Sequence, residues 1–224
     1  MATFTIAANA DDGHANNAAA QVFTDNANWV TMGRSGANYY SGYFRFDNVT
    51  IPAGATINSA KVTFQSVSNQ SGTNCNLNLY FCAEDDAVAP TDIASFNGKT
   101  LTSAVAWNAI GAWTTGTDYD TPDLTSILQE VIDRGGWASG NAVCVMANNN
   151  ASTSGAFRQA KSKDGASAPA ILTVTYTALS GTNMQINIGD VWKDVTDIKI
   201  NIGDTWKTVT KVQINIGDTW KDVF

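Results

Sequence analysis

The chain has 224 residues, of which 15% are charged, and its formal net charge at neutral pH is −7. Nucleic acids and anionic membranes attract basic proteins, so we expect neither as a partner. No stretch approaches the ~18 consecutive apolar residues of a membrane-spanning helix. The length suits one full domain with a smaller appendage.

Short alternating segments separated by polar stretches dominate the N-terminal part of the chain. Apolar and polar residues alternate in the segments 2–8, 39–46, 60–67 and 77–81, which predicts a strand in each. Between the first two, residues 11–17 are almost all polar and are expected to form a loop. Many short strands joined by polar turns are typical of an antiparallel β-protein.

One helix is predicted in the second half of the domain. Thr121 is the expected N-cap, Pro122 occupies the first helical position, and the two glycines that begin at Gly135 end the helix. Apolar residues follow at three- and four-residue spacing: Leu124, Ile127, Leu128 and Val131. This pattern predicts an amphipathic helix laid across one end of a β-sandwich.

Two further strands are predicted at residues 141–146 and 170–176. The sequence as a whole therefore predicts an all-β fold, an antiparallel jelly-roll β-sandwich with one short helix, over residues 1–179. Residues 180–224 form a separate segment.

That C-terminal segment contains the same 14-residue motif three times. The shared positions are the glycines Gly189, Gly203 and Gly217 and the tryptophans Trp192, Trp206 and Trp220. Each copy predicts a small β-hairpin. Glycine in the first turn position suits a two-residue turn. A three-residue Gly-Asp-Thr loop, which would place Trp206 opposite Ile202, is the alternative.

Hairpins of this size are marginally stable alone and have unpaired strand edges, so we expect the repeats to mediate assembly. A homotrimer with interleaved tails is the preferred interpretation, and a compact appendage of a monomer is the alternative. The predicted assembly residues are Ile188, Trp192, Ile202, Trp206, Ile216 and Trp220.

Several of these segments together resemble a known family. Residues 1–177 resemble the DNRLRE-type jelly-roll domains of bacterial surface proteins and phage structural proteins. The resemblance rests on the segments Phe44–Asp47, Ile51–Phe64, Thr121–Asp133 and Ala168–Tyr176. It implies a non-catalytic domain that is similar in fold to carbohydrate-binding modules. The C-terminal motif is similar to the Gly-x-x-Trp-Lys repeats that end many phage tail and fibre proteins.

These observations predict a non-enzymatic structural protein of a bacteriophage virion, either a head-decoration or fibre protein or a tail-fibre component. The N-terminus shows no signal peptide, which fits a protein made in the host cytoplasm and located in the virion. Its expected partners are further copies of itself and other virion proteins such as capsid or tail. The alternative is a glycan-binding module that recognises carbohydrate on the host surface.

Aromatic residues are the candidates for contact with a glycan, because sugar rings stack on flat apolar faces. Trp29, Tyr39 and Tyr40 are expected to be exposed and to provide such contacts. Trp107 and Trp137 are expected in the core.

Two neighbouring acids, Asp11 and Asp12, are candidate calcium ligands because calcium prefers oxygen atoms. No other cofactor is expected. The single histidine, His14, lies in the predicted polar loop and is not expected to act in catalysis.

Three cysteines are present: Cys75, Cys82 and Cys144. Cys144 lies in an apolar run and is expected to be a buried thiol. The sequence also allows one disulfide, such as Cys82–Cys144.

Overall fold

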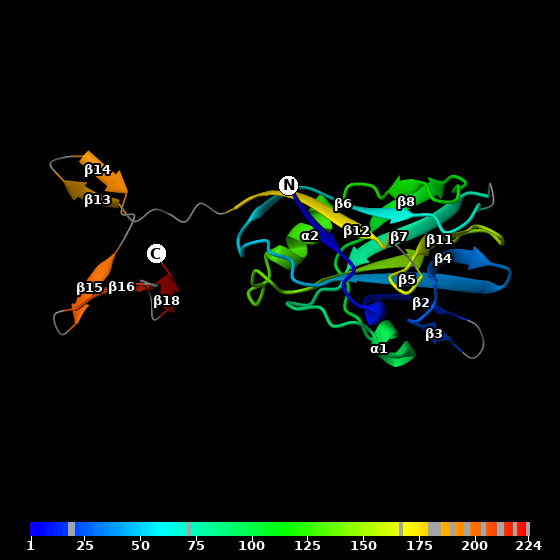
Figure 1. Ribbon diagram of the computed structural model, residues 1–224, viewed down its shortest axis with the longest axis horizontal. Helices are drawn as coiled ribbons and strands as arrows, with labels where there is room; N and C mark the ends of the chain where they lie inside the picture. The colour runs from blue at the N-terminus through cyan, green and yellow to red at the C-terminus, as the bar shows by residue number, and fades with distance from the viewer. Residues whose placement is uncertain are drawn as a thin grey trace. The chain divides into compact units, whose positions relative to one another are not determined.

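A computed structural model divides the chain into two compact units, Met1–Ala178 and Leu179–Phe224. The structure describes residues 1–17, 21–70, 73–165, 168–178, 185–188, 191–194, 198–202, 205–209, 213–216 and 219–222. The first unit is a β-sandwich, and the second contains the hairpin repeats (Figure 1).

The sandwich consists of two antiparallel sheets, which confirms the predicted all-β fold. The smaller sheet has the strand order β1 (Ala2–Thr5), β12 (Ile171–Thr177), β6 (Thr56–Gln65) and β9 (Asp118–Asp120). The larger has the order β11 (Phe157–Lys161), β4 (Trp29–Ser35), β5 (Asn38–Phe46), β10 (Val143–Asn149), β7 (Cys75–Phe81) and β8 (Val105–Ile110). Two short strands, β2 (Asp12–Asn16) and β3 (Phe23–Thr24), join the larger sheet through β5.

The core lies between the two sheets and follows directly from the alternating sequence. Val62 and Phe64 of β6 are fully buried, as are Leu79 and Phe81 of β7. The rings of Phe44 and Phe64, one from each sheet, are 4.7 Å apart between centroids. Burial of each such side chain contributes about 1.5–3 kcal/mol.

The predicted helix is present as α2 (Thr125–Ile132), which lies against β6, but its predicted start was wrong. Thr121 does not cap the helix, because its Oγ1 accepts a hydrogen bond from the backbone of Val62 at 3.0 Å. The Asp123 carboxylate accepts the bond from Thr125 N instead, at 3.1 Å. Because the Thr121 hydroxyl is hydrogen-bonded to β6, it is not available to cap the helix.

The prediction of a single helix was also wrong. A second, five-residue helix, α1 (Ile93–Asn97), begins after Asp92, whose carboxylate accepts a hydrogen bond from Ser95 N at 2.7 Å. The Ser95 hydroxyl in turn accepts a hydrogen bond from Asp92 N, which completes a capping box. A short 3-10 turn, Asn9–Asp11, precedes β2. Elements this short carry no helical periodicity that a sequence could show.

The expected polar loop at residues 11–17 is mostly the strand β2. Asp12 pairs with Phe44 and His14 with Gly42, so β5 uses this polar segment as a neighbouring strand. Pairing in the sheet overrides the weak strand propensity of Asp, Gly and Asn.

The second unit contains three two-stranded antiparallel sheets, one per repeat. They are formed by β13 (Gln185–Ile188) with β14 (Val191–Asp194), β15 (Lys199–Ile202) with β16 (Thr205–Thr208), and β17 (Gln213–Ile216) with β18 (Thr219–Asp222). Ile202 pairs with Thr205 and Asn201 with Trp206, as a two-residue connection requires. The alternative register, with Trp206 opposite Ile202, is therefore wrong.

Candidate functional site

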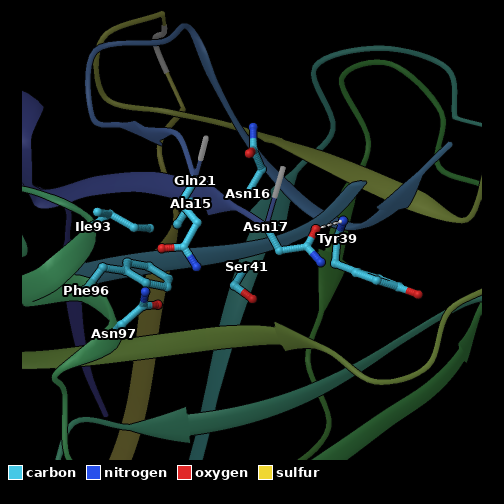
Figure 2. A pocket seen from close by; sticks show the side chains of 9 residues that line it. All are labelled: Ala15, Asn16, Asn17, Gln21, Tyr39, Ser41, Ile93, Phe96 and Asn97. Atoms are coloured by element: carbon cyan, nitrogen blue, oxygen red, sulfur yellow. Dashed lines mark hydrogen bonds between the residues drawn. The ribbon is translucent and has the colours of Figure 1, made fainter. Parts of the chain in front are cut away.

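A small hollow lies where β2, β5 and α1 meet (Figure 2). Its volume is about 100 Å³, below the ~300 Å³ of typical small-molecule pockets. Its lining is rich in side-chain amides and consists of Ala15, Asn16, Asn17, Gln21, Tyr39, Ser41, Ile93, Phe96 and Asn97. This hollow has room for a single polar substituent of a larger ligand.

The predicted glycan residue Tyr39 lines this hollow and is 36% exposed. Asn17 holds its backbone, because Asn17 Oδ1 accepts a hydrogen bond from Tyr39 N at 2.6 Å. The Arg34 guanidinium lies 4.8 Å from the centre of the Tyr39 ring, a cation–π contact that covers part of one ring face. Figure 2 shows the ring extending away from Ile93 and Phe96 of α1.

The structure does not combine the three predicted aromatics into one platform. Tyr40 is half-buried and its ring is tilted against that of His14, with the centroids 5.8 Å apart. Trp29 is 40% exposed, but it lies at the opposite end of β4 from Arg34, the partner of Tyr39. At about 3.3 Å per residue, this separation is about 16 Å along the strand.

A second hollow, of about 260 Å³, is lined by aromatic residues that were not singled out for ligand contact. Trp107 of β8 and Tyr119 of β9 are half-buried, and Trp113 is 1% exposed. The rings of Trp113 and Tyr119 are parallel within 5° and 4.8 Å apart, and Trp107 lies 6.1 Å from Trp113. Trp107 is thus only partly a core residue, whereas Trp137, 4% exposed, is buried as expected.

The wall of this aromatic hollow is held by a buried arginine. The Arg158 guanidinium donates hydrogen bonds to the carbonyl oxygens of Gly111 at 2.8 Å, Ile110 at 2.5 Å and Thr73 at 2.9 Å. Burial lowers the pKa of Arg158, since desolvation disfavours the charged form. Sequence reasoning missed this site because the pattern around Trp107 is typical of a core strand, and because Arg158, which holds the wall, is distant in sequence from the lining residues.

The two candidate calcium ligands, Asp11 and Asp12, bind different neighbours. Asp11 forms an ion pair with Arg45 at 2.8 Å. Asp12 is 1% exposed, and its Oδ2 accepts a hydrogen bond from Lys163 N at 2.9 Å. Burial, and to a smaller extent the nearby charge of Asp164, raise the pKa of Asp12 to about 7. Within the described ranges, no three His, Cys, Asp or Glu side chains form a group suited to a metal ion.

His14 is buried in β2 and not exposed in a loop. Its Nδ1 has no hydrogen-bond partner in the part of the chain that the structure describes, and burial lowers its pKa to about 4. His14 is therefore neutral at physiological pH. Among the described residues, no hydrogen bond to Nδ1 orients the ring in the way that a catalytic triad orients its histidine.

The three cysteines are buried, free thiols. Cys82 and Cys144 are close neighbours across the sheet, with Cys82 N donating to the Cys144 carbonyl at 2.8 Å, but no bond joins their sulfur atoms. Burial of Cys144 is as expected, and burial also raises the pKa of the Cys75 thiol.

The predicted assembly residues belong to the strands of the repeat unit. Their side chains (Ile188, Trp192, Ile202, Trp206, Ile216 and Trp220) lie outside the described residues. The structure establishes the pairing of their backbones, as given above.

No protein-family model matches this chain, and no curated protein does. The resemblance to DNRLRE-type domains therefore stays a prediction. Among the described residues, no helix is both long and apolar enough to cross a membrane.

Proposed function

We propose that this chain is a non-enzymatic structural protein of a bacteriophage virion, a head-decoration, fibre or tail-fibre component. In this proposal the sandwich is the displayed domain, and the C-terminal repeats join copies of the chain to one another and to other virion proteins such as capsid or tail. The observation that carries the proposal is the repeat unit, three copies of one hairpin outside the sandwich.

The physical argument starts from the weakness of a lone hairpin. A two-stranded sheet is marginally stable in water, and each of these hairpins has strands of four residues. Within the described strands of the repeats, each hairpin pairs only with itself, which leaves edges that other chains can contact. Contacts between copies in a closed symmetric oligomer, preferably a trimer, stabilise such elements.

The solution mass of the full chain, compared with that of a chain ending at Thr177, tests the assembly role. Light scattering after size exclusion should give a trimer for the full chain and a monomer for the shortened one. A full chain that is monomeric at all concentrations, or a shortened chain that stays trimeric, would contradict it. The virion location requires that peptides of the chain be found in purified particles, in a fixed ratio to the main shell protein.

The aromatic hollow supports a second function, binding of host glycans. Half-buried Trp107 and Tyr119 offer apolar ring surface in this hollow, whose lining also includes the polar residues Asn108 and Asp120. Sugars are recognised by this combination of a flat aromatic face with a polar group. The volume of about 260 Å³ approaches that of ordinary ligand pockets.

Titration with neutral and acidic oligosaccharides, followed by tryptophan fluorescence, tests this function. The Trp107→Ala variant should lose binding at least tenfold, whereas Trp29→Ala, a change of the same size at a separate exposed tryptophan, should retain it. Loss in Trp29→Ala alone would place binding at the sequence-predicted residue. Absence of any binding by the unchanged protein would exclude the glycan function for the sugars tested.

A further inference from the structure

The Asp12 carboxylate is buried with half of its hydrogen-bonding capacity unused. The residue is 1% exposed, and only Oδ2 is bonded, to the backbone of Lys163. Oδ1 is inaccessible to solvent and has no partner within the described ranges. A buried carboxylate oxygen without a donor is costly and rare in native structures, so a missing partner is the expected explanation.

A second acid that also has a buried carboxylate oxygen without a hydrogen-bond partner lies nearby. Asp164 belongs to the turn that follows β11, and its Oδ2 is also buried and unpartnered among the described residues. Its negative charge acts on the Asp12 carboxylate. Residues 12 and 164 are far apart in sequence, so the fold itself brings two like charges together.

Backbone carbonyl oxygens lie close to the two glycines that directly follow these acids. A Cβ at Gly13 would collide with the carbonyl oxygen of Thr24, and one at Gly165 with that of Asn28. The Ser162 hydroxyl donates to the Ala27 carbonyl at 2.6 Å and joins the turn after β11 to the 24–28 loop.

Among the described residues, neither acid forms an ion pair, and the charge of the Lys163 side chain offsets that of Asp12 only in part. No Lys, Arg or His side chain lies within 4.0 Å of the Asp12 or Asp164 carboxylate in the described part of the chain. The neighbouring Asp11 differs, since its charge is paired with Arg45. A bound cation would satisfy both free oxygens and both charges.

We propose that Asp12 and Asp164 bind a calcium ion, with backbone carbonyl oxygens of the 24–28 loop and water completing the coordination. Calcium takes six to eight oxygen ligands in flexible geometry, which suits carboxylates and carbonyls supplied by loops. Magnesium demands a stricter octahedron and retains more of its water. The ion connects β2 to the turn after β11. This calcium site does not depend on the function proposed above. Its carboxylate ligands are Asp12 and Asp164, instead of the pair Asp11 and Asp12 that the sequence suggested.

The test uses the full chain stripped of metal with EGTA and then titrated with CaCl2 alone. At 100 times the Kd, calcium should raise the Tm by about 5–10 °C. Terbium, which substitutes for calcium, should give luminescence excited through Trp29, one residue beyond Asn28, and excess calcium should remove that signal. Asp12→Asn and Asp164→Asn should each abolish both effects, and Asp118→Asn, on the exposed face of β9, should preserve them.

The sign of the Asp12→Asn effect gives a second readout. In EGTA this variant should melt no lower than the unchanged protein, because it removes a buried charge, and in calcium the order should reverse. Two results would overturn the proposal: no change in Tm or luminescence with the unchanged protein, or full responses in both Asp→Asn variants. A Tm that rises in EGTA on acidification towards pH 5, with no response to calcium, would identify the pair as carboxyls sharing a proton.

Discussion

Arg158 shows how one buried side chain can hold the wall of a surface hollow in place. Its guanidinium is completely buried and donates to main-chain carbonyls from the segments before β7 and after β8, and from its own strand. These oxygens have negative partial charge, so they stabilise the cation without a carboxylate. The positions of Ile110 and Gly111, and with them the wall of the aromatic hollow, depend on this side chain.

We therefore predict that Arg158→Met lowers the free energy of unfolding by about 3 kcal/mol, because several buried carbonyls lose their donors at once. Urea denaturation measures this difference. Arg34→Met is the matched control, since the contacts of the Arg34 side chain with the described residues are an exposed hydrogen bond and a ring contact, and it should change stability by less than about 0.5 kcal/mol. Equal effects of both variants would contradict the assigned role of Arg158.

His14 predicts a defined dependence of stability on pH. Its pKa is about 4 in the folded chain and near 6.5 when unfolded, so the unfolded chain binds the extra proton between these values. The His14 contribution is complete above pH 6.5 and is lost as the pH falls to 4, by about 3 kcal/mol. The difference in unfolding free energy between the unchanged protein and His14→Gln should follow this curve. A difference that is constant with pH would show that His14 is accessible to protons in the folded state.

At the scale of elements, alternation in the sequence identified the strands that carry the core. β6 and β7 each bury every second residue over most of their length, so the period of two is unambiguous. β2 could not be found in this way, because its strand state depends on pairing with β5 and its residues Asp12 and Gly13 favour turns. The Asp12–Asp164 pair was missed because it combines residues from distant segments, whereas the aromatic hollow, which residues 107–120 line, was missed because Trp107 lies in a core-like pattern.

The helix α2 offers a direct test of packing at this scale. Leu128 is fully buried against the core, so Leu128→Ala should lower the unfolding free energy by about 2–5 kcal/mol through loss of apolar burial and the cavity it leaves. Ser126, in the same helix and exposed, provides the control, and Ser126→Ala should be neutral within about 0.5 kcal/mol. Chemical denaturation of both variants distinguishes a packed helix from one that merely covers the surface.

At the scale of the whole molecule, the sandwich has an extensive core of its own. The main core cluster of the described residues extends from Phe4 to Val174, all within the first unit. We therefore expect a chain ending at Thr177 to melt within about 2 °C of the sandwich transition in the full chain. Differential scanning calorimetry measures both. A large drop in Tm would show that the repeats stabilise the sandwich directly.

The spacing of the hairpins has a consequence for the length of the protein. Each hairpin completes its backbone pairing within one repeat, and β14 and β16 are each followed, after four residues, by the first strand of the next hairpin. Removal of residues 195–208 would therefore connect β14 to β17 through a linker of unchanged length. Gain or loss of 14 residues leaves every remaining strand in register, so recombination within the gene can change the number of hairpins in whole steps, without selection having to repair the fold.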